Sequence, residues 1–393
     1  RSQSLIAPRI QTKRNNLSSR EVQNLRRQFP IVKNKVFMNH AAFSPPCRAV
    51  KRAYERCLHE WDSMDTHRWF DEVPETKKLL SKLVKCTADE VAFTPNTSTG
   101  ISSIATALPH QEGSNVVVTD LEYPAVTYTW LALQRRGKLE VRFVKNRGGR
   151  IDPSDVEKNV DDRTVAVSIS EVEFGTGFRN DMKTLSEIAH EHGAYIVNDA
   201  IQSAGAMNVD VRHQDVDFLV AGGFKWLLGP LGTGYMYARK EVAAELETTI
   251  VGASSVDPER EKLYIGTEYI PASSAKRFET GSYNMIGYLT GKEALRLLTD
   301  LGTPKIERRI LCLTDYLIDR LQRMKVSIIT PLERESRSGI VTFKVRRLQQ
   351  VLKKLTARNF ILAPRAGGLR ASPHFYNTEK EIDKLANELS RLI

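Results

Sequence analysis

The sequence of 393 residues lacks long apolar runs and contains few cysteines. No run approaches the roughly 20 apolar residues of a membrane-spanning helix, and the first residues lack the hydrophobic region of a signal peptide. The four cysteines, Cys47, Cys57, Cys86 and Cys312, form no CxxC pair and have no partner histidine at metal-binding spacing. These absences predict no membrane association, no metal site and a reducing compartment, for which the cytoplasm is the simplest choice.

Acidic residues are missing from one long stretch of the chain. None occurs between Arg337 and Thr378, and the formal net charge of the whole chain is +11. A basic stretch can bind nucleic acid or another polyanion, or it can form a solvated face around a site for anionic small molecules. Because no RNA- or DNA-binding motif is present, the second interpretation is favoured and no nucleic-acid partner is expected.

The sequence does contain a repeated alternation of strand and helix patterns. Between residues 36 and 239, short apolar runs alternate with stretches whose apolar residues follow helical spacing. This alternation predicts an α/β fold with a mostly parallel sheet that is covered by helices on both faces. The strand candidates are Val91–Phe93, Asn115–Val118, Val141–Val144, Thr164–Ser168, Ala194–Val197, Phe218–Ala221 and Gly234–Ala238.

The length of the chain exceeds what one hydrophobic core usually supports, so two domains are expected. Long helical patterns follow residue 287, and a smaller set of strand and helix patterns runs to the C-terminus. The expected division is an N-terminal arm (1–35) that joins the small domain, a large domain (36–296) and a small α+β domain (297–393).

One lysine stands in an apolar, glycine-rich segment with no carboxylate beside it. Lys225 follows the strand candidate Phe218–Ala221, within the run GGFKWLLG. An unpaired ammonium is costly to bury. The side chain therefore either extends to water or carries a neutral, reactive amine.

A carboxylate and an amide follow the preceding strand candidate. Asp199 and Gln202 come just after Ala194–Val197, and ligands of open α/β sheets bind beyond the carboxyl ends of the strands. Asp199 and Lys225 would then face the same crevice. This pair suits pyridoxal 5'-phosphate (PLP), because a lysine forms a Schiff base with the aldehyde and an aspartate keeps the pyridine nitrogen protonated. The sequence therefore predicts a PLP site in which the amine of Lys225 works in its neutral form.

A hydroxyl-rich segment fits the phosphate of this cofactor. Thr97 and Ser98 follow the strand candidate Val91–Phe93 and begin a helical pattern. The free N–H groups of a helix N-terminus bind phosphate. A simple helix cap explains the same residues, so this segment supports the PLP site only together with Asp199 and Lys225.

Several motifs of the chain together resemble a known family. They are TSTG at residues 97–100, NDAIQS at 198–203, GGFKW at 222–226 and RAS at 370–372. From about residue 36 to the C-terminus, the sequence resembles the class V aminotransferases. This group of fold-type-I PLP enzymes includes cysteine desulfurases, kynureninases and isopenicillin-N-epimerase-like proteins. The resemblance implies a large domain with a mostly parallel sheet and a smaller α+β domain.

The resemblance also implies which residues hold the cofactor. Lys225 is expected to carry the Schiff base and then to shuttle protons. Asp199 is expected to pair with the pyridine nitrogen, and Gln202 to donate a hydrogen bond to the ring hydroxyl oxygen. Tyr123 is expected to cover the face of the ring. Thr97 and Ser98 are expected to bind the phosphate.

Further implied roles concern the substrate and a second subunit. Arg370 is expected to bind the α-carboxylate of the substrate, which suits the geometry of a guanidinium. His40 lies in a segment that borders the substrate in relatives. Ser282 is expected to reach the phosphate from the partner subunit, which implies a homodimer with shared active sites.

The chain departs from the family pattern at positions that matter for the reaction. Gly222 and Phe224 stand where many relatives have a serine and a histidine, and Phe174 stands where desulfurases place an asparagine. The segment 363–370 has no cysteine and is too short for the desulfurase loop. Because a thiolate is needed to take sulfur from cysteine, desulfurase activity by the usual persulfide route is expected to be absent.

Three reactions of an α-amino acid stay open at this point: transamination, epimerisation and elimination of a side-chain group. They share the cofactor and Lys225, and the sequence does not reveal the residues that select among them. The default expectation is an aminotransferase; an isopenicillin-N-epimerase-like epimerase or a C–S or C–X lyase is the alternative. A non-enzymatic alternative is a polyanion-binding protein with a vestigial site, which would use the basic face.

Overall fold

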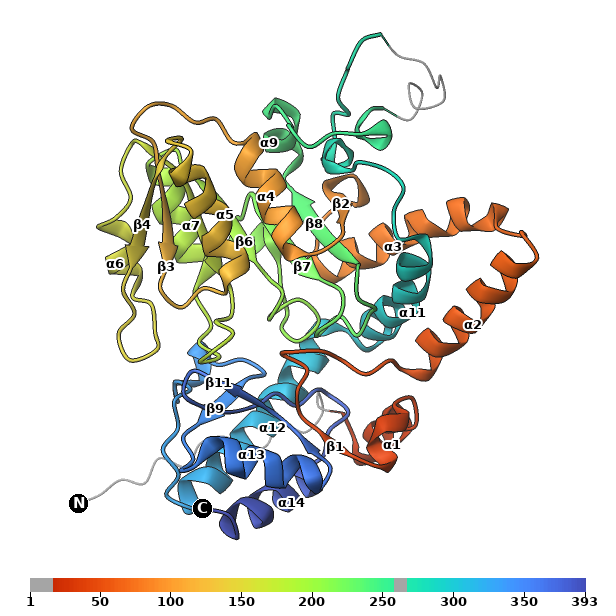
Figure 1. Ribbon diagram of the computed structural model, residues 1–393, viewed down its shortest axis with the longest axis vertical. Helices are drawn as coiled ribbons and strands as arrows, with labels where there is room; N and C mark the ends of the chain where they lie inside the picture. The colour runs from red at the N-terminus through yellow and green to blue at the C-terminus, as the bar shows by residue number, and fades with distance from the viewer. Residues whose placement is uncertain (1–16, 258–266) are drawn as a thin grey trace.

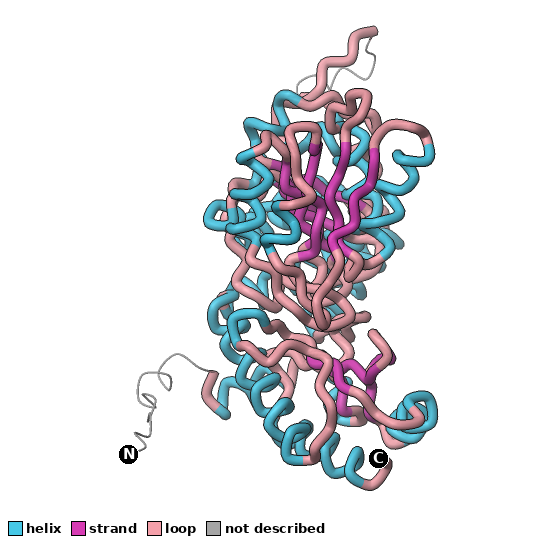
Figure 2. Tube along the Cα trace, turned by 90° about the vertical axis from the view of Figure 1, so that its left-hand side faces the viewer, coloured by secondary structure: helices cyan, strands magenta, loops and turns pink. Residues whose placement is uncertain are grey.

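The computed structural model describes residues 17–257 and 267–393, which form two parts (Figure 1). The larger part contains a seven-stranded sheet, and the smaller part contains a three-stranded sheet and the last helices of the chain. Figure 2, turned by 90°, shows the two sheets one above the other. The large sheet is the element that positions the site described below.

The strands of the large sheet lie in the order β2-β8-β7-β6-β5-β3-β4. Their bounds are β2 (Val91–Thr94), β3 (Asn115–Thr119), β4 (Glu140–Val144), β5 (Thr164–Ser170), β6 (Tyr195–Asp199), β7 (Phe218–Gly222) and β8 (Gly234–Ala238). Strand β8 is antiparallel to both of its neighbours, and the pairs from β7 to β4 are parallel. The predicted fold class, with its mostly parallel sheet, is confirmed.

Both faces of the large sheet are buried. In β3, Val116 and Val118 pack in a cluster with α4 (Thr97–Ala107) and α5 (Pro124–Arg135), whereas Val117 belongs to the cluster on the opposite face. Successive side chains of a strand point to opposite faces, so a strand covered on both sides needs apolar residues throughout. The continuous apolar runs of the sequence are therefore the direct consequence of this layering.

Most other helices of the larger part pack on the second face and its edge, whereas α9 (Lys240–Glu245) packs with α4 and α5 on the first. Helix α11 packs along α2 and α3, and the three lie together on the right of Figure 1. The bounds are α2 (Arg48–Asp62), α3 (His67–Val84), α6 (Pro153–Glu157), α7 (Met182–Glu191), α8 (Val211–Gln214), α9 (Lys240–Glu245) and α11 (Met285–Leu301). Within residues 17–257 and 267–393, no helix has the length and apolar character that crossing a membrane requires.

The smaller part combines both ends of the described chain. Its antiparallel sheet has the order β11-β12-β9, and β1 pairs in parallel with β10. The strands are β1 (Val36–Phe37), β9 (Val341–Phe343), β10 (Phe360–Ile361), β11 (Ala363–Arg365) and β12 (Gly368–Ala371); the helices are α1 (Ser19–Arg26), α12 (Thr303–Arg323), α13 (Leu348–Ala357) and α14 (Glu379–Ser390). Arg26 also forms an ion pair of 2.8 Å with Glu381, which ties α1 to α14.

The expected domain division stays a prediction. Residues 1–16 of the arm lie outside the described residues. Helix α11 continues through residue 296, so a boundary at that position would cut a helix. The chain turns at Gly302, whose φ of 79° suits glycine, and α12 begins at the next residue.

Basic residues of the stretch 337–378, which contains no acidic residue, pair with acidic residues of other elements. Arg337 pairs with Asp315 of α12, and Arg358 pairs with Glu388 of α14. Tertiary contacts thus supply carboxylates that the local sequence lacks, which reduces the uncompensated charge of this stretch.

The loop that follows β7 is held by close backbone contacts. The N–H of Gly223 donates to the carbonyl of Thr233 at 2.8 Å, and the N–H of Gly229 donates to the carbonyl of Gly223 at 2.8 Å. A Cβ atom at Gly205 would lie 2.4 Å from the carbonyl oxygen of Trp226, so this loop approaches the turn at residue 205 as closely as glycine permits. These contacts fix the backbone of the loop that carries Lys225.

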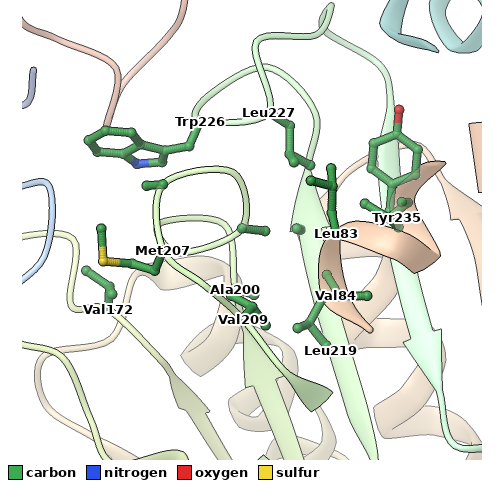
Figure 3. Close-up of a cluster of buried hydrophobic side chains, with 14 of the residues drawn as sticks. Leu83, Val84, Val172, Ala200, Met207, Val209, Leu219, Trp226, Leu227 and Tyr235 are labelled. Atoms are coloured by element: carbon green, nitrogen blue, oxygen red, sulfur yellow. The ribbon is translucent and has the colours of Figure 1, made fainter. Parts of the chain in front are cut away.

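The two side chains that follow Lys225 in sequence anchor this loop in the core. Figure 3 shows Trp226 on the side of Met207 and Leu227 on the side of Leu83, within one buried cluster. Burial of a tryptophan and a leucine contributes several kcal/mol. This anchoring leaves the lysine little freedom to move with its backbone.

We expect Gly205→Ala to lower the free energy of unfolding by about 1–3 kcal/mol, because the new methyl group would overlap the carbonyl of Trp226. The φ of +92° at this position adds strain for any L residue. Urea unfolding followed by tryptophan fluorescence measures the change. Gly193→Ala is the matched control, since its φ is +70° but no atom of the described residues lies within 4 Å of the added Cβ. Equal destabilisation by both variants would contradict the close contact.

Candidate active site

One cavity collects most of the residues that the sequence analysis singled out. It has a volume of about 190 Å³ and lies at the carboxyl ends of β6 and β7, beside the start of α4. The predicted residues that line it are Lys225, Asp199, Gln202, Tyr123, Thr97, Ser98 and Arg370. Parallel strands place their carboxyl ends at one edge, which explains why residues far apart in sequence meet here.

Lys225 is nearly buried, with 9% of its surface exposed. Its Nζ lies 5.7 Å from the ring centre of Tyr123 and 5.8 Å from that of Phe224. Burial lowers the pKa of Lys225 to about 8, and the charge of Arg370 acts in the same direction while that of Asp199 opposes it. The amine is thereby brought close to the neutral form that nucleophilic and proton-transfer chemistry requires.

Asp199 ends β6 and is buried beside this lysine. Its Oδ1 accepts a hydrogen bond of 2.9 Å from the N–H of Ile201. Burial raises the pKa of Asp199 to about 6, against the opposing effects of the Ile201 N–H and the charge of Lys225. The value stays below neutral pH, so the ionised carboxylate predominates there and can hold a protonated ring nitrogen.

Gln202 has its side-chain amide oriented by two hydrogen bonds. The Nε1–H of Trp226 donates to Oε1 at 2.8 Å, and Nε2 donates to the carbonyl of Ala41 at 3.0 Å. Because an indole N–H can only donate, the amide oxygen must face Trp226. The second N–H of Nε2 is then left for a ligand in the cavity.

Glu122 is a buried carboxyl group that the sequence analysis did not single out. Its carboxyl group accepts two hydrogen bonds from Ser170, one from the backbone N–H at 2.8 Å and one from the side-chain hydroxyl at 2.5 Å. Burial raises the pKa of Glu122 to about 8, and the nearby charge of Asp199 acts in the same direction. A neutral Glu122 at pH 7 leaves Asp199 as the charged member of this pair.

The start of α4 has the properties of a phosphate site. Asn96 caps the helix by accepting from the N–H of Thr99 at 2.9 Å, and the N–H groups of the first two residues have no partner among residues 17–257 and 267–393. Thr97 Oγ1 is buried and has no hydrogen-bond partner in the described part of the chain. A buried hydroxyl without a partner is costly, and a phosphate oxygen would satisfy it. The residues present therefore fit the phosphate of PLP.

Arg370 lies on β12, is buried and lines the cavity. Its Nη1 donates to the carbonyl of Phe174 at 2.7 Å, whereas Nε and Nη2 have no partner among the described residues. Burial, with a smaller effect of Arg365, lowers the pKa of Arg370 to about 9, so the guanidinium remains charged at neutral pH. Its unpartnered N–H groups can donate hydrogen bonds to a carboxylate.

Arg365 also lines the cavity and is not among the residues predicted from the sequence. It pairs with Gly368 across a hairpin whose two turn residues, Ala366 and Gly367, have φ of 49° and 72°. A two-residue turn of this kind is a recognisable sequence signal when glycine occupies the second position. That signal would have placed Arg365 on the same side of the hairpin as Arg370.

The structure does not place His40 among the residues that line the cavity, and its expected role at the substrate stays a prediction. The ring is fully buried, and Nδ1 lies 2.9 Å from the carbonyl of Ser372 and Nε2 lies 2.7 Å from the hydroxyl of Tyr376. Both ring nitrogens are therefore occupied. His40 links the N-terminal segment to the smaller part of the chain.

Ser282 lies outside the cavity as well, in a separate hollow that Thr99 and Gly281 also line. Its expected contact with a phosphate concerns a second subunit. That contact, and the homodimer it implies, stay predictions.

A family model described as "Aminotransferase class-V" matches residues 54–385. The chain belongs to the class V aminotransferase family. It is 29% identical to a probable cysteine desulfurase of Methanothermobacter thermautotrophicus, over 94% of this chain and 98% of the relative. It is 27% identical to the uncharacterized aminotransferase YcbU of Bacillus subtilis, over 94% of this chain and 97% of the relative.

The fold is also that of solved PLP enzymes. A C-DES variant with glycine covalently linked to the PLP cofactor superposes with a TM-score of 0.85 and 21% identity, over 93% of this chain and 98% of that chain. The cofactor of the class V family member described here is PLP. The expectation that desulfurase activity is absent gains no support from the relatives, since the first of them is named a probable cysteine desulfurase.

The lowered pKa of Lys225 predicts the pH dependence of its reaction with the cofactor. We expect the rate at which the apo chain takes up PLP, followed by the absorption of the bound cofactor, to rise with pH until about 8 and then to level off. The reason is that only the neutral amine attacks an aldehyde. An ordinary lysine would give a rate that rises towards pH ~10.

Asp199→Asn serves as the companion variant for this measurement. It removes the negative charge that opposes the shift of the Lys225 pKa, so the midpoint of the profile should move to lower pH. Lys225→Ala should show no covalent uptake at any pH. A midpoint near pH ~10 in the unmodified chain would contradict the shift.

Proposed function

We propose that the protein is a PLP-dependent aminotransferase that acts on a small α-amino acid. The observation that carries the proposal is the arrangement of Lys225, Asp199 and Arg370 around one cavity. An amine of lowered pKa, a carboxylate on the neighbouring strand end and a guanidinium with unpartnered N–H groups face a common space. These are the groups that a PLP enzyme needs for the cofactor and for the carboxylate of its substrate.

The cofactor would be held at four of its groups. Lys225 would bind its aldehyde covalently, Asp199 would pair with the pyridine nitrogen, and Gln202 would donate its remaining N–H to the ring hydroxyl oxygen. Thr97 and Ser98 would bind the phosphate at the start of α4. When bound, PLP acts as an electron sink that stabilises negative charge at the substrate Cα.

The residues of the chain would then control the position and protonation of the substrate. Arg370 would bind the α-carboxylate and so fix the orientation of the amino acid. Lys225, once its amine is neutral, would take the proton from Cα and return it at another atom. Tyr123, whose ring lies 5.7 Å from Lys225 Nζ, would cover the cavity and limit the access of water.

The cysteines of the chain do not supply a thiol to this cavity. All four lie in the described ranges, and none of them lines it. Burial raises the pKa of Cys47 and of Cys57, which keeps both thiols protonated. A persulfide route needs a thiolate near the substrate, so we favour amino transfer over desulfuration. The proposed homodimer, its use of Ser282 and the cytoplasmic location stay predictions.

The test is a panel of α-amino acids, each supplied with a 2-oxo acid as amino acceptor. Amino transfer predicts that a new amino acid and a new 2-oxo acid form in equal amounts. Release of ammonia with a 2-oxo acid would instead identify a lyase, and change of the Cα configuration alone an epimerase. Alanine formed from cysteine, with sulfur retained on the protein, would identify a desulfurase and overturn the proposal.

The proposal also predicts the behaviour of the protein before any substrate is added. The purified chain should have a visible absorption band that borohydride abolishes, and Lys225→Ala should lack it. A chain that shows no band after incubation with PLP would overturn the enzymatic proposal. Steeply salt-dependent binding of a polyanion would then favour the basic-face alternative.

Arg370→Ala should raise the KM for the amino acid by about 10- to 100-fold, because a charge-assisted hydrogen bond is lost. The visible absorption band of the bound cofactor should be retained. Arg370→Lys is the matched control and should show a smaller increase, since the charge remains but the paired N–H groups do not. Loss of the cofactor from Arg370→Ala would show that the arginine holds PLP rather than the substrate.

A further inference from the structure

The hairpin of β11 and β12 presents two arginines to the cavity. Arg365 pairs with Gly368, and Arg370 lies two residues farther along β12, so the two side chains project from the same face. Both line the cavity. The hairpin thus delivers two guanidinium groups to one binding space.

Neither guanidinium has an acidic partner within the described part of the chain. Arg365 Nη1 donates to the carbonyl of the preceding residue, Pro364, at 2.7 Å, and Arg370 Nη1 donates to the carbonyl of Phe174 at 2.7 Å. Asp199 is the one carboxylate among the described lining residues, whereas Lys225 adds a third cationic group. The cavity therefore has a surplus of positive charge.

The proposed function, on which this inference rests, leaves one of these positive charges without a role. Asp199 and Lys225 are engaged by the cofactor, the start of α4 takes the phosphate, and Arg370 takes the α-carboxylate of the substrate. Arg365 then remains as a partly exposed cation at the edge of the substrate space. A second anionic group on the substrate would neutralise it.

We propose that Arg365 binds a side-chain carboxylate, and that the substrates are dicarboxylic α-amino acids of the size of aspartate or glutamate and the corresponding 2-oxo diacids. The two arginines repel each other within the cavity, and a ligand with two carboxylates would offset this repulsion at both ends. The effect of Arg365 on the pKa of Arg370 shows that the two charges act on each other. A guanidinium also suits a carboxylate because it can form two parallel hydrogen bonds.

The test uses ligands that cannot react, so that its result is independent of turnover. Succinate and glutarate are titrated calorimetrically into the PLP-loaded protein, with butyrate and pentanoate as monocarboxylates of the same chain length. We expect each dicarboxylate to bind about tenfold or more tightly than its monocarboxylate, as a charge-assisted contact provides. Dicarboxylates that bind no more tightly, including a lack of measurable binding by both classes, overturn the proposal.

Two substitutions of Arg365 test whether this residue causes the preference for dicarboxylates. Arg365→Leu should abolish the difference between the two classes of ligand, and Arg365→Lys should keep part of it. Arg346→Leu is the matched control, because Arg346 is exposed and does not line the cavity, and it should keep the full difference. Retention of the difference in Arg365→Leu overturns the assignment.

The same variants separate this proposal from its main alternative and from the proposed function. If Arg365→Leu loses PLP during dialysis faster than Arg346→Leu does, the arginine binds the cofactor phosphate and the proposal is overturned. If the cofactor band and amino transfer are present but dicarboxylates have no advantage, the proposed function stands and this inference fails.

Discussion

The burial of one amine beside one carboxylate is the constraint on which the site depends. Lys225 and Asp199 stand at the ends of neighbouring parallel strands, and each side chain is in an environment that disfavours its charge. Their mutual attraction limits both shifts, so the amine titrates close to neutral pH while the carboxylate stays ionised. The rest of the fold holds this pair in place.

That constraint explains features that are far from the cavity in sequence. The sheet must be covered on both faces, or the strand ends would be hydrated and the shifts would disappear. The loop after β7 must be rigid, which Gly205 and Gly223 allow through close backbone contacts. Trp226 then both anchors the loop and orients Gln202 through its indole N–H.

The sequence predicted the fold and most of the cavity for a specific physical reason. The strands of a doubly covered sheet are continuous apolar runs, and functional residues follow them at a fixed edge, so Asp199, Lys225 and Thr97 were recognisable from local order alone. Glu122 was not recognisable, because its burial depends on β5 packing beside its turn. The hydrogen bonds of His40 were not recognisable either, because its partners Ser372 and Tyr376 lie more than 300 residues away.

Two buried histidines, His40 and His374, belong to the hydrogen-bond network that connects the smaller part of the chain to the cavity wall. Burial lowers the pKa of His40 and of His374, so both rings are neutral and each has one donor and one acceptor nitrogen. His374 accepts from the N–H of Phe375 at Nδ1, which leaves Nε2–H to donate to the carbonyl of Trp226. Since Trp226 in turn orients Gln202, a continuous set of neutral hydrogen bonds runs from the smaller part to the cavity wall. The lowered pKa values of both histidines keep this path uncharged near neutral pH.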